Sequence, residues 1–293
     1  MDWGGTHLRA LLIAADGRVI ARRETACGAI SLGAGEHPAV LEGLLGDWRA
    51  QGLPVLVCGM AGARNGWREL AYRDCPAGAD ELRAGLVEVE AGIRLVPGVK
   101  RDSASAGVEV MRGEETQVLG AIALDPAHAE ALVICPGTHS KWVRASAGRI
   151  ADFRTCITGE LFAALAARWS KTEAAAEPAW PAFDRGLAVG LRDPLSSALF
   201  SVRSGYATRR LDEGEIRDYL SGVLIGAEIA ACRESVDLRP GDGAPTLIVG
   251  APELARRYAR ALAAVGAAAP IALDADACVA GGLSRILAAG GQA

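Results

Sequence analysis

Lysine and aromatic residues are scarce in this sequence of 293 residues. Only Lys100, Lys141 and Lys171 are lysines among the 31 basic residues, and aromatic residues make up 5% of the chain. We interpret this imbalance as a compositional bias of the genome. The formal net charge is −4, and this lack of a basic surplus argues against a general binder of nucleic acids or of anionic membranes.

Paired cysteines, an amino-terminal leader and long apolar runs are also missing. The seven cysteines are scattered and form no Cys-x-x-Cys motif, which argues against a zinc knuckle and a disulfide framework. The sequence begins Met-Asp-Trp-Gly-Gly, without the charged and apolar regions of a signal peptide. Its apolar runs are shorter than the roughly 20 residues that span a bilayer. We therefore expect a soluble, cytoplasmic protein.

Several common catalytic motifs are absent from the sequence. It contains no Gly-Lys-Ser/Thr of a Walker loop and no Gly-x-Gly-x-x-Gly that opens a helix. It also lacks His-Glu-x-x-His and the Gly-x-Ser-x-Gly of a nucleophile elbow. A phosphate group would have to be bound by another device.

The length of the chain suggests two domains or one large barrel. About half of the residues are hydrophobic and 23% are charged, so a sizeable core can form. Apolar strands alternate with helical patterns, which predicts an α/β fold with a mostly parallel or mixed sheet. The two halves repeat one plan, and each begins with a strand that ends in a Gly/Thr turn, near Asp2 and near Ala131.

Apolar spacing and turn residues predict the individual elements. In the first half we expect a hairpin over 8–24 with its turn at Asp16-Gly17, a helix over 37–49, strands over 53–60 and 93–99, and a helix over 111–124. In the second half we expect a strand over 131–135, a hairpin over 141–155, a helix over 158–168, a surface loop over 171–181, one or two helices over 211–232, a strand over 246–249 that leads into a helix, and a final helix over 274–287.

The segment that begins at Asp2 carries the sharpest chemical signal. Gly4 and Gly5 let a turn between strands expose backbone N–H groups to an anion without obstruction by Cβ atoms. The Thr6 hydroxyl adds a donor, and Asp2 can hold a hydrated Mg²⁺ ion, which favours carboxylates and retained water. An ordinary glycine-rich turn with a surface aspartate is the alternative interpretation.

A second turn of the same kind follows the strand that begins the second half. Gly137, Thr138, Ser140 and the scarce lysine Lys141 lie within residues 135–142. Two such turns, one in each half, can face each other and hold one polyphosphate between them. The pair therefore favours phosphate binding over two unrelated turns.

These turns resemble the phosphate-binding hairpins of the sugar kinase, hexokinase and actin superfamily. More narrowly, the chain resembles the 2-dehydro-3-deoxygalactonokinase family. The matching stretches span nearly the whole chain: DWGGTHLRALL (2–12), GMAGARNGW (59–67), VMRGEETQVLGA (110–121), PGTHSKWV (136–143), FRTCITGELF (153–162), YLSGVLIGAEIA (219–230) and IVGAPELARRY (248–258). The resemblance implies a two-lobed, actin-like ATPase (ribonuclease H-like) fold with a ligand cleft between the lobes.

The resemblance also implies an activity, the ATP- and Mg²⁺-dependent phosphorylation of 2-dehydro-3-deoxy-D-galactonate at its 6-hydroxyl in galactonate degradation. The implied partners are ATP and a small sugar acid, with no nucleic acid or membrane, and a homodimer is compatible with the family. Two alternatives stay open. One is a kinase of another sugar or amino sugar, and the other is a non-catalytic sensor of nucleotide or sugar.

By the same resemblance, the residues that bind ATP and magnesium lie in the two turns and near the last strand. The two phosphate turns comprise Gly4, Gly5, Thr6, Gly137, Thr138, His139 and Ser140. Asp2 acts through the water shell of the magnesium ion. Gly250 and Ala251 border the adenosine, and Gly226 lies on a helix that flanks it.

We expect the sugar acid beside residues 59–67, because they follow a parallel-type strand, where α/β sheets bind ligands. Asn65 can bridge sugar hydroxyls, and Arg64 can pair bidentately with a carboxylate. Trp67 offers a ring face, and simple core packing is its alternative role. The other candidates for substrate contact are Arg112, Glu114 and Lys141.

A carboxylate commonly accepts the proton of the attacking hydroxyl in phosphoryl transfer. In the superfamily this aspartate precedes a Gly-Glu pair on the interdomain helix, which is Gly113-Glu114 here. The upstream carboxylates are Asp102 and Glu109, and related chains often have Asp where this one has Glu109. We favour Asp102, because an aspartate in a loop at a strand end can turn into the cleft. A solvated loop charge is the alternative.

The implied division places residues 1–111 in an amino-terminal lobe and residues 112–276 in a carboxy-terminal lobe, with helix 277–293 as a candidate to complete the first. In the superfamily an apolar strand precedes the Asp-Trp-Gly turn and is central to the first sheet. This sequence begins at Met1, so we expect that strand to be missing. We also expect a form extended upstream by apolar residues to be more stable.

Overall fold

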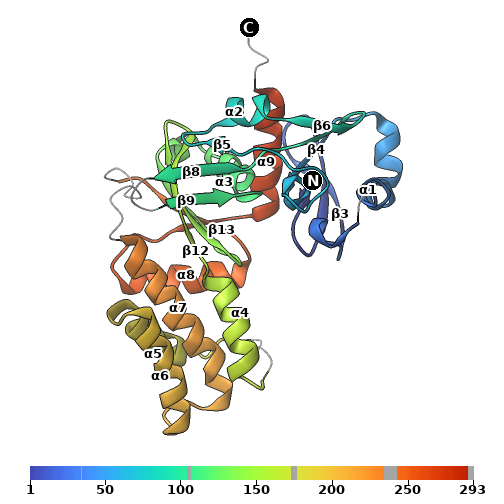
Figure 1. Cartoon of the computed structure of the whole chain (residues 1–293). Helices are drawn as coiled ribbons and strands as arrows, with labels where there is room; N and C mark the ends of the chain where they lie inside the picture. The colour runs from blue at the N-terminus through green and yellow to red at the C-terminus, as the bar shows by residue number, and fades with distance from the viewer. Residues whose placement is uncertain (34, 104–106, 173–176, 234–242, 290–293) are drawn as a thin grey trace.

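The computed structural model describes residues 1–33, 35–103, 107–172, 177–233 and 243–289 (Figure 1). Its strands form a six-stranded, a five-stranded and a three-stranded sheet. Helices lie between the sheets and project from them as a separate group, labelled α4 to α7 in Figure 1. Every helix of the described ranges is too short or too polar to cross a membrane.

The six-stranded sheet contains strands from the first third of the chain, in the order β3-β2-β1-β4-β7-β6. These strands are β1 (Asp2–Trp3), β2 (Leu8–Ile13), β3 (Val19–Thr25), β4 (Val55–Gly59), β6 (Val87–Glu90) and β7 (Ile93–Leu95). The first three form an antiparallel meander, and β4 runs parallel to both β1 and β7. The helix α1 (His37–Leu45) packs Leu41 and Leu45 into a core with Trp3 and Leu8.

The five-stranded sheet repeats this plan in the second half, in the order β12-β11-β10-β13-β14. Its strands are β10 (Ala131–Cys135), β11 (Ser140–Ser146), β12 (Arg149–Cys156), β13 (Thr246–Val249) and β14 (Ile271–Leu273). Again the first three are antiparallel, and the next two run parallel to β10. The predicted repetition of one plan in the two halves is confirmed, and with it the two-lobed α/β architecture.

A third sheet joins the two halves. It contains β5 (Arg73–Asp74), β8 (Val99–Ser103) and β9 (Gly107–Met111), in the order β5-β8-β9. A bridge from Ala77 to Ile150 ties this region to β12. The sequence analysis missed the β8–β9 hairpin and assigned its last residue, Met111, to a helix. Three charged residues follow one another in β8, and Glu109 lies between exposed valines in β9, so the strands lack a continuous apolar run.

Eight further α-helices lie in the described residues after α1. They are α2 (Ala79–Ala84), α3 (Glu114–Ala123), α4 (Thr158–Trp169), α5 (Trp180–Arg192), α6 (Leu195–Ala207), α7 (Ile216–Arg233), α8 (Pro252–Ala264) and α9 (Ala275–Ala288). The expected helices over 37–49, 111–124, 158–168, 211–232 and 274–287 are confirmed within a few residues, whereas α2, α5 and α6 were not predicted. The expected loop over 171–181 is wrong at its end, because Trp180 and Pro181 begin α5, and its residues 173–176 lie outside the described ranges.

The helices α3 and α9 cross at very short range at the junction of the two halves. A Cβ atom at Gly120 would lie 1.7 Å from the carbonyl oxygen of Cys278, and one at Gly282 would lie 2.0 Å from that of Thr116. The surrounding core contains residues of both large sheets, such as Leu56 and Val133. Because this core is continuous across the halves, the division at residue 111 stays a prediction.

The first strand is present but short, which corrects the expectation that it is missing. The two residues of β1 occupy the central position of the six-stranded sheet, between β2 and β4. The amino group of Met1 donates a hydrogen bond to the Leu56 carbonyl oxygen at 2.7 Å. Burial lowers the pKa of this amino group. An ionisable group thus occupies a place in the sheet where a peptide N–H commonly lies.

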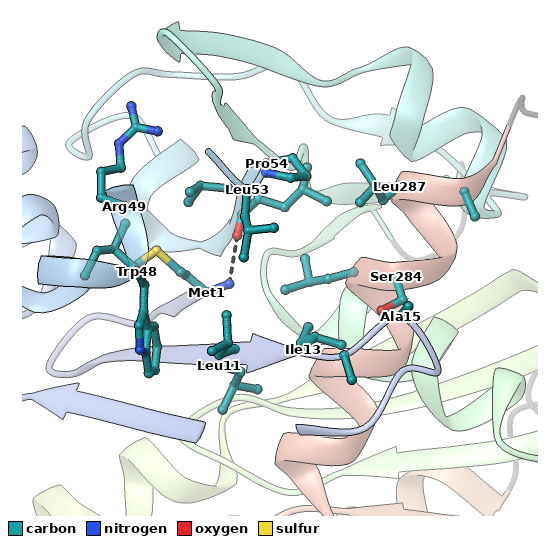
Figure 2. A pocket seen from close by; sticks show the side chains of 17 residues that line it. Met1, Leu11, Ile13, Ala15, Trp48, Arg49, Leu53, Pro54, Ser284 and Leu287 are labelled. Atoms are coloured by element: carbon teal, nitrogen blue, oxygen red, sulfur yellow. Dashed lines mark hydrogen bonds between the residues drawn. The ribbon is translucent and has the colours of Figure 1, made fainter. Parts of the chain in front are cut away.

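An apolar cavity of about 550 Å³ opens where an upstream continuation of β1 would run (Figure 2). Its lining includes Leu11 and Ile13 of β2, Leu53 before β4, and Leu283 and Leu287 of α9. The pairings Asp2↔Arg9 and Asp2↔Cys58, continued upstream, would place added residues between β2 and β4. The cavity therefore has the shape and the chemistry of a strand position.

We expect an amino-terminal extension of about four apolar residues, for example Val-Ile-Ala-Val before Met1, to fill this cavity. The melting temperature should rise by about 5 °C or more, because apolar surface is buried and the charged amino group leaves the core. A Gly-Ser-Gly-Ser extension of the same length is the control. Equal melting temperatures of the two extended proteins in scanning calorimetry would contradict the interpretation.

Candidate active site

The first turn joins β1 to β2 at the centre of the six-stranded sheet. The Gly4 amide donates to the His7 carbonyl oxygen at 2.9 Å, and the Gly4 carbonyl accepts from the Ala29 amide at 3.0 Å. Gly28 packs so tightly on this turn that a Cβ there would lie 1.8 Å from the Gly5 carbonyl oxygen. Gly28, which the sequence analysis missed, therefore fixes the position of the turn.

A cavity of about 390 Å³ borders the first turn. Asp2, Gly4, Thr6 and Arg9 contribute to its lining. The Arg9 guanidinium forms an ion pair with Asp2 and a second one with Asp276 of α9 at 3.1 Å. Sequence reasoning did not single out Arg9 or Asp276, although Arg9 belongs to the string DWGGTHLR that carried the resemblance.

The residues near Asp2 suit a magnesium ion that keeps its water ligands better than an ion bound only by protein atoms. In the part of the chain that the structure describes, no three His, Cys, Asp or Glu residues are placed to hold a metal. Asp2 offers one carboxylate beside an open cavity, with the Thr6 hydroxyl in the same lining. Mg²⁺ keeps several waters and is commonly bound by one or two carboxylates together with phosphates.

The second turn joins β10 to β11 and is fixed by the amino-terminal end of α4. The Glu160 amide donates to the Thr138 carbonyl oxygen at 3.0 Å, and the Glu160 carboxylate bonds His139 at 2.7 Å. A Cβ at Gly159 would lie 2.2 Å from the Gly137 carbonyl oxygen. The position after Thr158 therefore needs glycine, which the sequence analysis had not linked to the turn.

A cavity of about 300 Å³ lies beside the second turn. Gly137 and Ser140 line it from the turn, and α7 and α8 line it from the other side with Ser221, Leu224 and Tyr258, among others. Apolar and polar groups are mixed in this lining, as in many small-molecule sites. The cavity therefore extends from the second turn to α7 and α8.

The three adenosine candidates differ in their placement. Gly250 packs on the second turn, with a Cβ position 3.3 Å from Pro136 Cδ. Ala251 is exposed directly before α8. Gly226 faces α5, and its Cβ would lie 2.6 Å from the Leu187 carbonyl oxygen. The helix α7 does flank the cavity, but the glycine at 226 is explained by helix packing.

A buried carboxylate, Glu228 of α7, lies behind the second cavity. It accepts hydrogen bonds from Trp142 Nε1 at 2.6 Å, from the Tyr258 hydroxyl at 2.9 Å and from the Thr158 hydroxyl. Tyr258 in turn bonds Ser140 at 2.9 Å. Burial raises the pKa of Glu228, while these donors act in the opposite direction.

The loop over 59–67 places its three candidates differently. Arg64 and Asn65 are exposed and free to meet a ligand. Trp67 stacks on His37 with ring centroids 5.8 Å apart and meets Trp3 edge to face at 6.2 Å. This arrangement supports core packing, the alternative role of Trp67.

Arg112 and Lys141 are buried near the start of α3, and Glu114 beside them is partly exposed. Arg112 donates to the Leu70 carbonyl oxygen at 2.9 Å and lies over the Tyr72 ring. The Lys141 ammonium lies 3.2 Å from the Glu114 carboxylate and donates to the His139 carbonyl oxygen at 3.0 Å. Lys141 is only 3% exposed, so it links α3 to the second turn rather than facing open solvent.

The two base candidates lie on opposite faces of the β8–β9 hairpin. Asp102 is exposed and pairs with Val108, which is 64% exposed. Glu109 faces β12, where it accepts a hydrogen bond from the Thr155 amide. Thr155 is the cross-strand partner of Lys141. The structure therefore brings Glu109, and not the favoured Asp102, next to β12, the strand that pairs with β11 after the second turn.

Two glycine turns lie at the ends of two sheets whose first five strands have the same order, and a cavity borders each turn. This repeated arrangement defines an actin-like ATPase fold. The family model described as 2-keto-3-deoxy-galactonokinase matches residues 2–286. The chain belongs to this family of sugar-acid kinases.

Individual relatives agree with this assignment. The 2-dehydro-3-deoxygalactonokinase of Escherichia coli K12 is 37% identical over 275 residues, which cover 91% of this chain and 89% of that protein. A crystal structure from Sinorhizobium meliloti, provisionally described as a 2-dehydro-3-deoxygalactonokinase, has 36% identity and a TM-score of 0.83 and covers 98% of this chain and 97% of its own. The component A of an Acidaminococcus fermentans (R)-2-hydroxyglutaryl-CoA dehydratase shares the fold alone, with 13% identity and a TM-score of 0.52 over 97% of this chain and 93% of its own.

Glu115 of α3 is a fully buried acid next to the candidate residue Glu114. It accepts hydrogen bonds from the Gly113 amide at 2.6 Å and the Thr116 hydroxyl at 3.0 Å. Burial, and then the neighbouring Glu114, raise the pKa of Glu115 from 4.5 to about 8. The folded protein therefore holds a proton that the unfolded chain releases between about pH 4.5 and 8.

We expect the stability of the wild-type protein to fall, relative to that of Glu115→Gln, as the pH rises through this interval. The difference in unfolding free energy should change by up to about 1.4 kcal/mol per pH unit. Urea denaturation at about pH 5 and about pH 8 measures it, with the exposed Glu42→Gln as the control. A constant difference between wild type and Glu115→Gln would contradict the assignment of a buried, protonated Glu115.

Proposed function

We propose that this protein is an ATP-dependent kinase that phosphorylates 2-dehydro-3-deoxy-D-galactonate at its 6-hydroxyl. The observation that supports it best is the pair of glycine turns, each held by a second glycine at van der Waals contact, Gly28 on the first and Gly159 on the second. Turns fixed in this way keep backbone N–H groups available to a polyphosphate. The 37% identity to the E. coli 2-dehydro-3-deoxygalactonokinase points to the sugar acid.

In this proposal each candidate group has a separate task. The amides of the two turns hold the phosphates, and Asp2 contacts a Mg²⁺ ion through water. When bound, that ion would neutralise charge that develops on the transferred phosphoryl group. Arg64 and Asn65 bind the sugar acid, because a guanidinium pairs with a carboxylate and an amide bridges hydroxyls.

We further propose Glu109 as the base that accepts the proton of the sugar hydroxyl. It is the carboxylate upstream of α3 that lies beside β12, near Lys141. Glu109 has 13% of its side chain exposed and lies 3.8 Å from Arg154 and 3.9 Å from Arg101. These guanidinium groups would stabilise the anionic phosphoryl group that arrives next to it.

We also infer how the chain is divided into lobes, where the protein lies and what it binds. We infer an amino-terminal lobe of residues 1–111, completed by the end of the chain from 277, and a carboxy-terminal lobe of residues 112–276. A cytoplasmic location, a homodimer, and the absence of nucleic-acid and membrane partners belong to the same proposal. Closure of the two lobes on both substrates would exclude water from the transfer step.

Release of ADP by the purified protein tests the proposed reaction. We expect release with ATP, Mg²⁺ and 2-dehydro-3-deoxy-D-galactonate, and much less with the gluconate epimer or plain hexoses. Release with a hexose alone would favour a kinase of another sugar. ATP binding in calorimetry without any turnover would favour a sensor, and no release with any sugar acid would contradict the proposal.

Two chemically matched substitutions on the β8–β9 hairpin test which carboxylate is the base. Glu109→Gln should lower kcat by a factor of about 10² to 10⁴, the usual effect of losing a general base. Asp102→Asn, on the exposed face, should change kcat by less than about threefold. Steady-state kinetics with the sugar acid measures both, and an equal or larger loss in Asp102→Asn would refute the choice of Glu109.

A further inference from the structure

The buried carboxylate Glu228 controls the direction of the hydrogen bonds behind the second turn. Glu228 is 5% exposed and lies on α7, beneath the cavity of about 300 Å³ beside the second turn. Trp142 reaches it from β11, Thr158 from the start of α4, and Tyr258 from α8. Four elements of the second half therefore meet on one acidic group.

Each of these partners donates its proton to Glu228. An indole N–H can only donate, and a carboxylate can only accept when it is ionised. The Tyr258 hydroxyl lies 2.9 Å from both oxygens of Glu228, so its single proton points to the carboxylate. The oxygen of Tyr258 then has only lone pairs for Ser140, which lies 2.9 Å away. Ser140 must therefore donate to Tyr258.

The same reasoning applies to Thr158, whose hydroxyl also donates its proton to Glu228. Ser140 and Thr158 both line the cavity beside the second turn. With their protons directed inward, these two hydroxyls present lone pairs to whatever occupies the cavity. Phosphate oxygens are acceptors as well, so they would meet no donor at these side chains.

We propose that Glu228 is a positioning residue that makes Ser140 and Thr158 hydrogen-bond acceptors for the nucleoside part of the bound nucleotide. The inference rests on the proposed kinase function. The ligand group is an O–H or N–H donor, either a ribose hydroxyl or the amino group of the base. Leu224, Ile225 and Phe162 in the same lining offer the apolar surface that a purine ring requires. Ser140 then serves the nucleoside, and backbone amides of the turn serve the phosphates.

Calorimetric titration with four nucleotides tests this assignment. 2′-Deoxy-ATP and 3′-deoxy-ATP each lack one ribose hydroxyl of ATP, and ITP has a carbonyl oxygen in place of the 6-amino group and carries a proton on N1. For wild type we expect one analogue to bind about tenfold more weakly than ATP, the effect of one hydrogen bond. The identity of that analogue distinguishes a ribose hydroxyl from the base amino group.

The variant Glu228→Gln carries an amide that donates to Tyr258 or Thr158 and reverses the chain of hydrogen bonds. We expect it to bind ATP about as weakly as the sensitive analogue, so that the ratio of their Kd values falls to about one. Tyr258→Phe frees the Ser140 proton while keeping the ring, and it should lower the ratio when Ser140 makes the contact. Glu177→Gln, with an exposed carboxylate, should keep the wild-type ratio.

Four results would overturn the proposal. One is equal binding of all four nucleotides by wild type. Another is a Glu228→Gln protein that binds ATP and the sensitive analogue more weakly by one common factor, which a purely structural role predicts. The third is the absence of ATP binding by wild type, which would refute the proposed kinase function as well. An intact kinase with unchanged ratios in the variants would refute only the role of Glu228.

Discussion

The crossing of α3 and α9 is the contact on which the candidate active site depends. Gly120 and Gly282 let the two backbones approach so closely that any side chain at either position would collide with a carbonyl group. The amino-terminal end of α3 presents Glu114 to Lys141. The amino-terminal end of α9 presents Asp276 to Arg9. One helix crossing thus connects the charged groups near the two glycine turns.

Charged side chains of the candidate site form ion pairs with one another. Asp2 is paired with Arg9, and Glu114 with Lys141. A nucleotide and a sugar acid both bring negative charge, so contact with Arg9 or Lys141 would require these cations to exchange partners. Arg64, exposed on its loop, is available to a carboxylate without such an exchange. The proposed substrate therefore matches the charges that the protein leaves at its surface.

Much of the fold could be predicted from the sequence, because its main strands are apolar runs that end in glycine turns. The strand over 131–135, the hairpins that follow the two turns and the final helix are all confirmed. The β8–β9 hairpin could not be predicted in this way, since one of its faces is exposed and the other is charged. The same hairpin decides between Asp102 and Glu109, which lie on its two faces.

Residues that act through close packing were the hardest to find. Gly28 and Gly159 touch the two turns, but nothing in their local sequence distinguishes them from other glycines. Gly226 and Trp67 stood in strings that carried the resemblance, and the structure explains both by packing on α5 and on His37. The central strand β1 keeps its position with two residues, which no pattern of apolar residues could reveal.

The central claim is that the two turns bind one nucleotide together. Hydrogen–deuterium exchange of backbone amides, with and without a non-hydrolysable ATP analogue and Mg²⁺, tests it most directly. We expect slower exchange in residues 4–7 and in residues 137–140 at the same analogue concentration, with the surface hairpin turn at Asp16-Gly17 unchanged. Protection of one turn alone, or of neither, would contradict the claim.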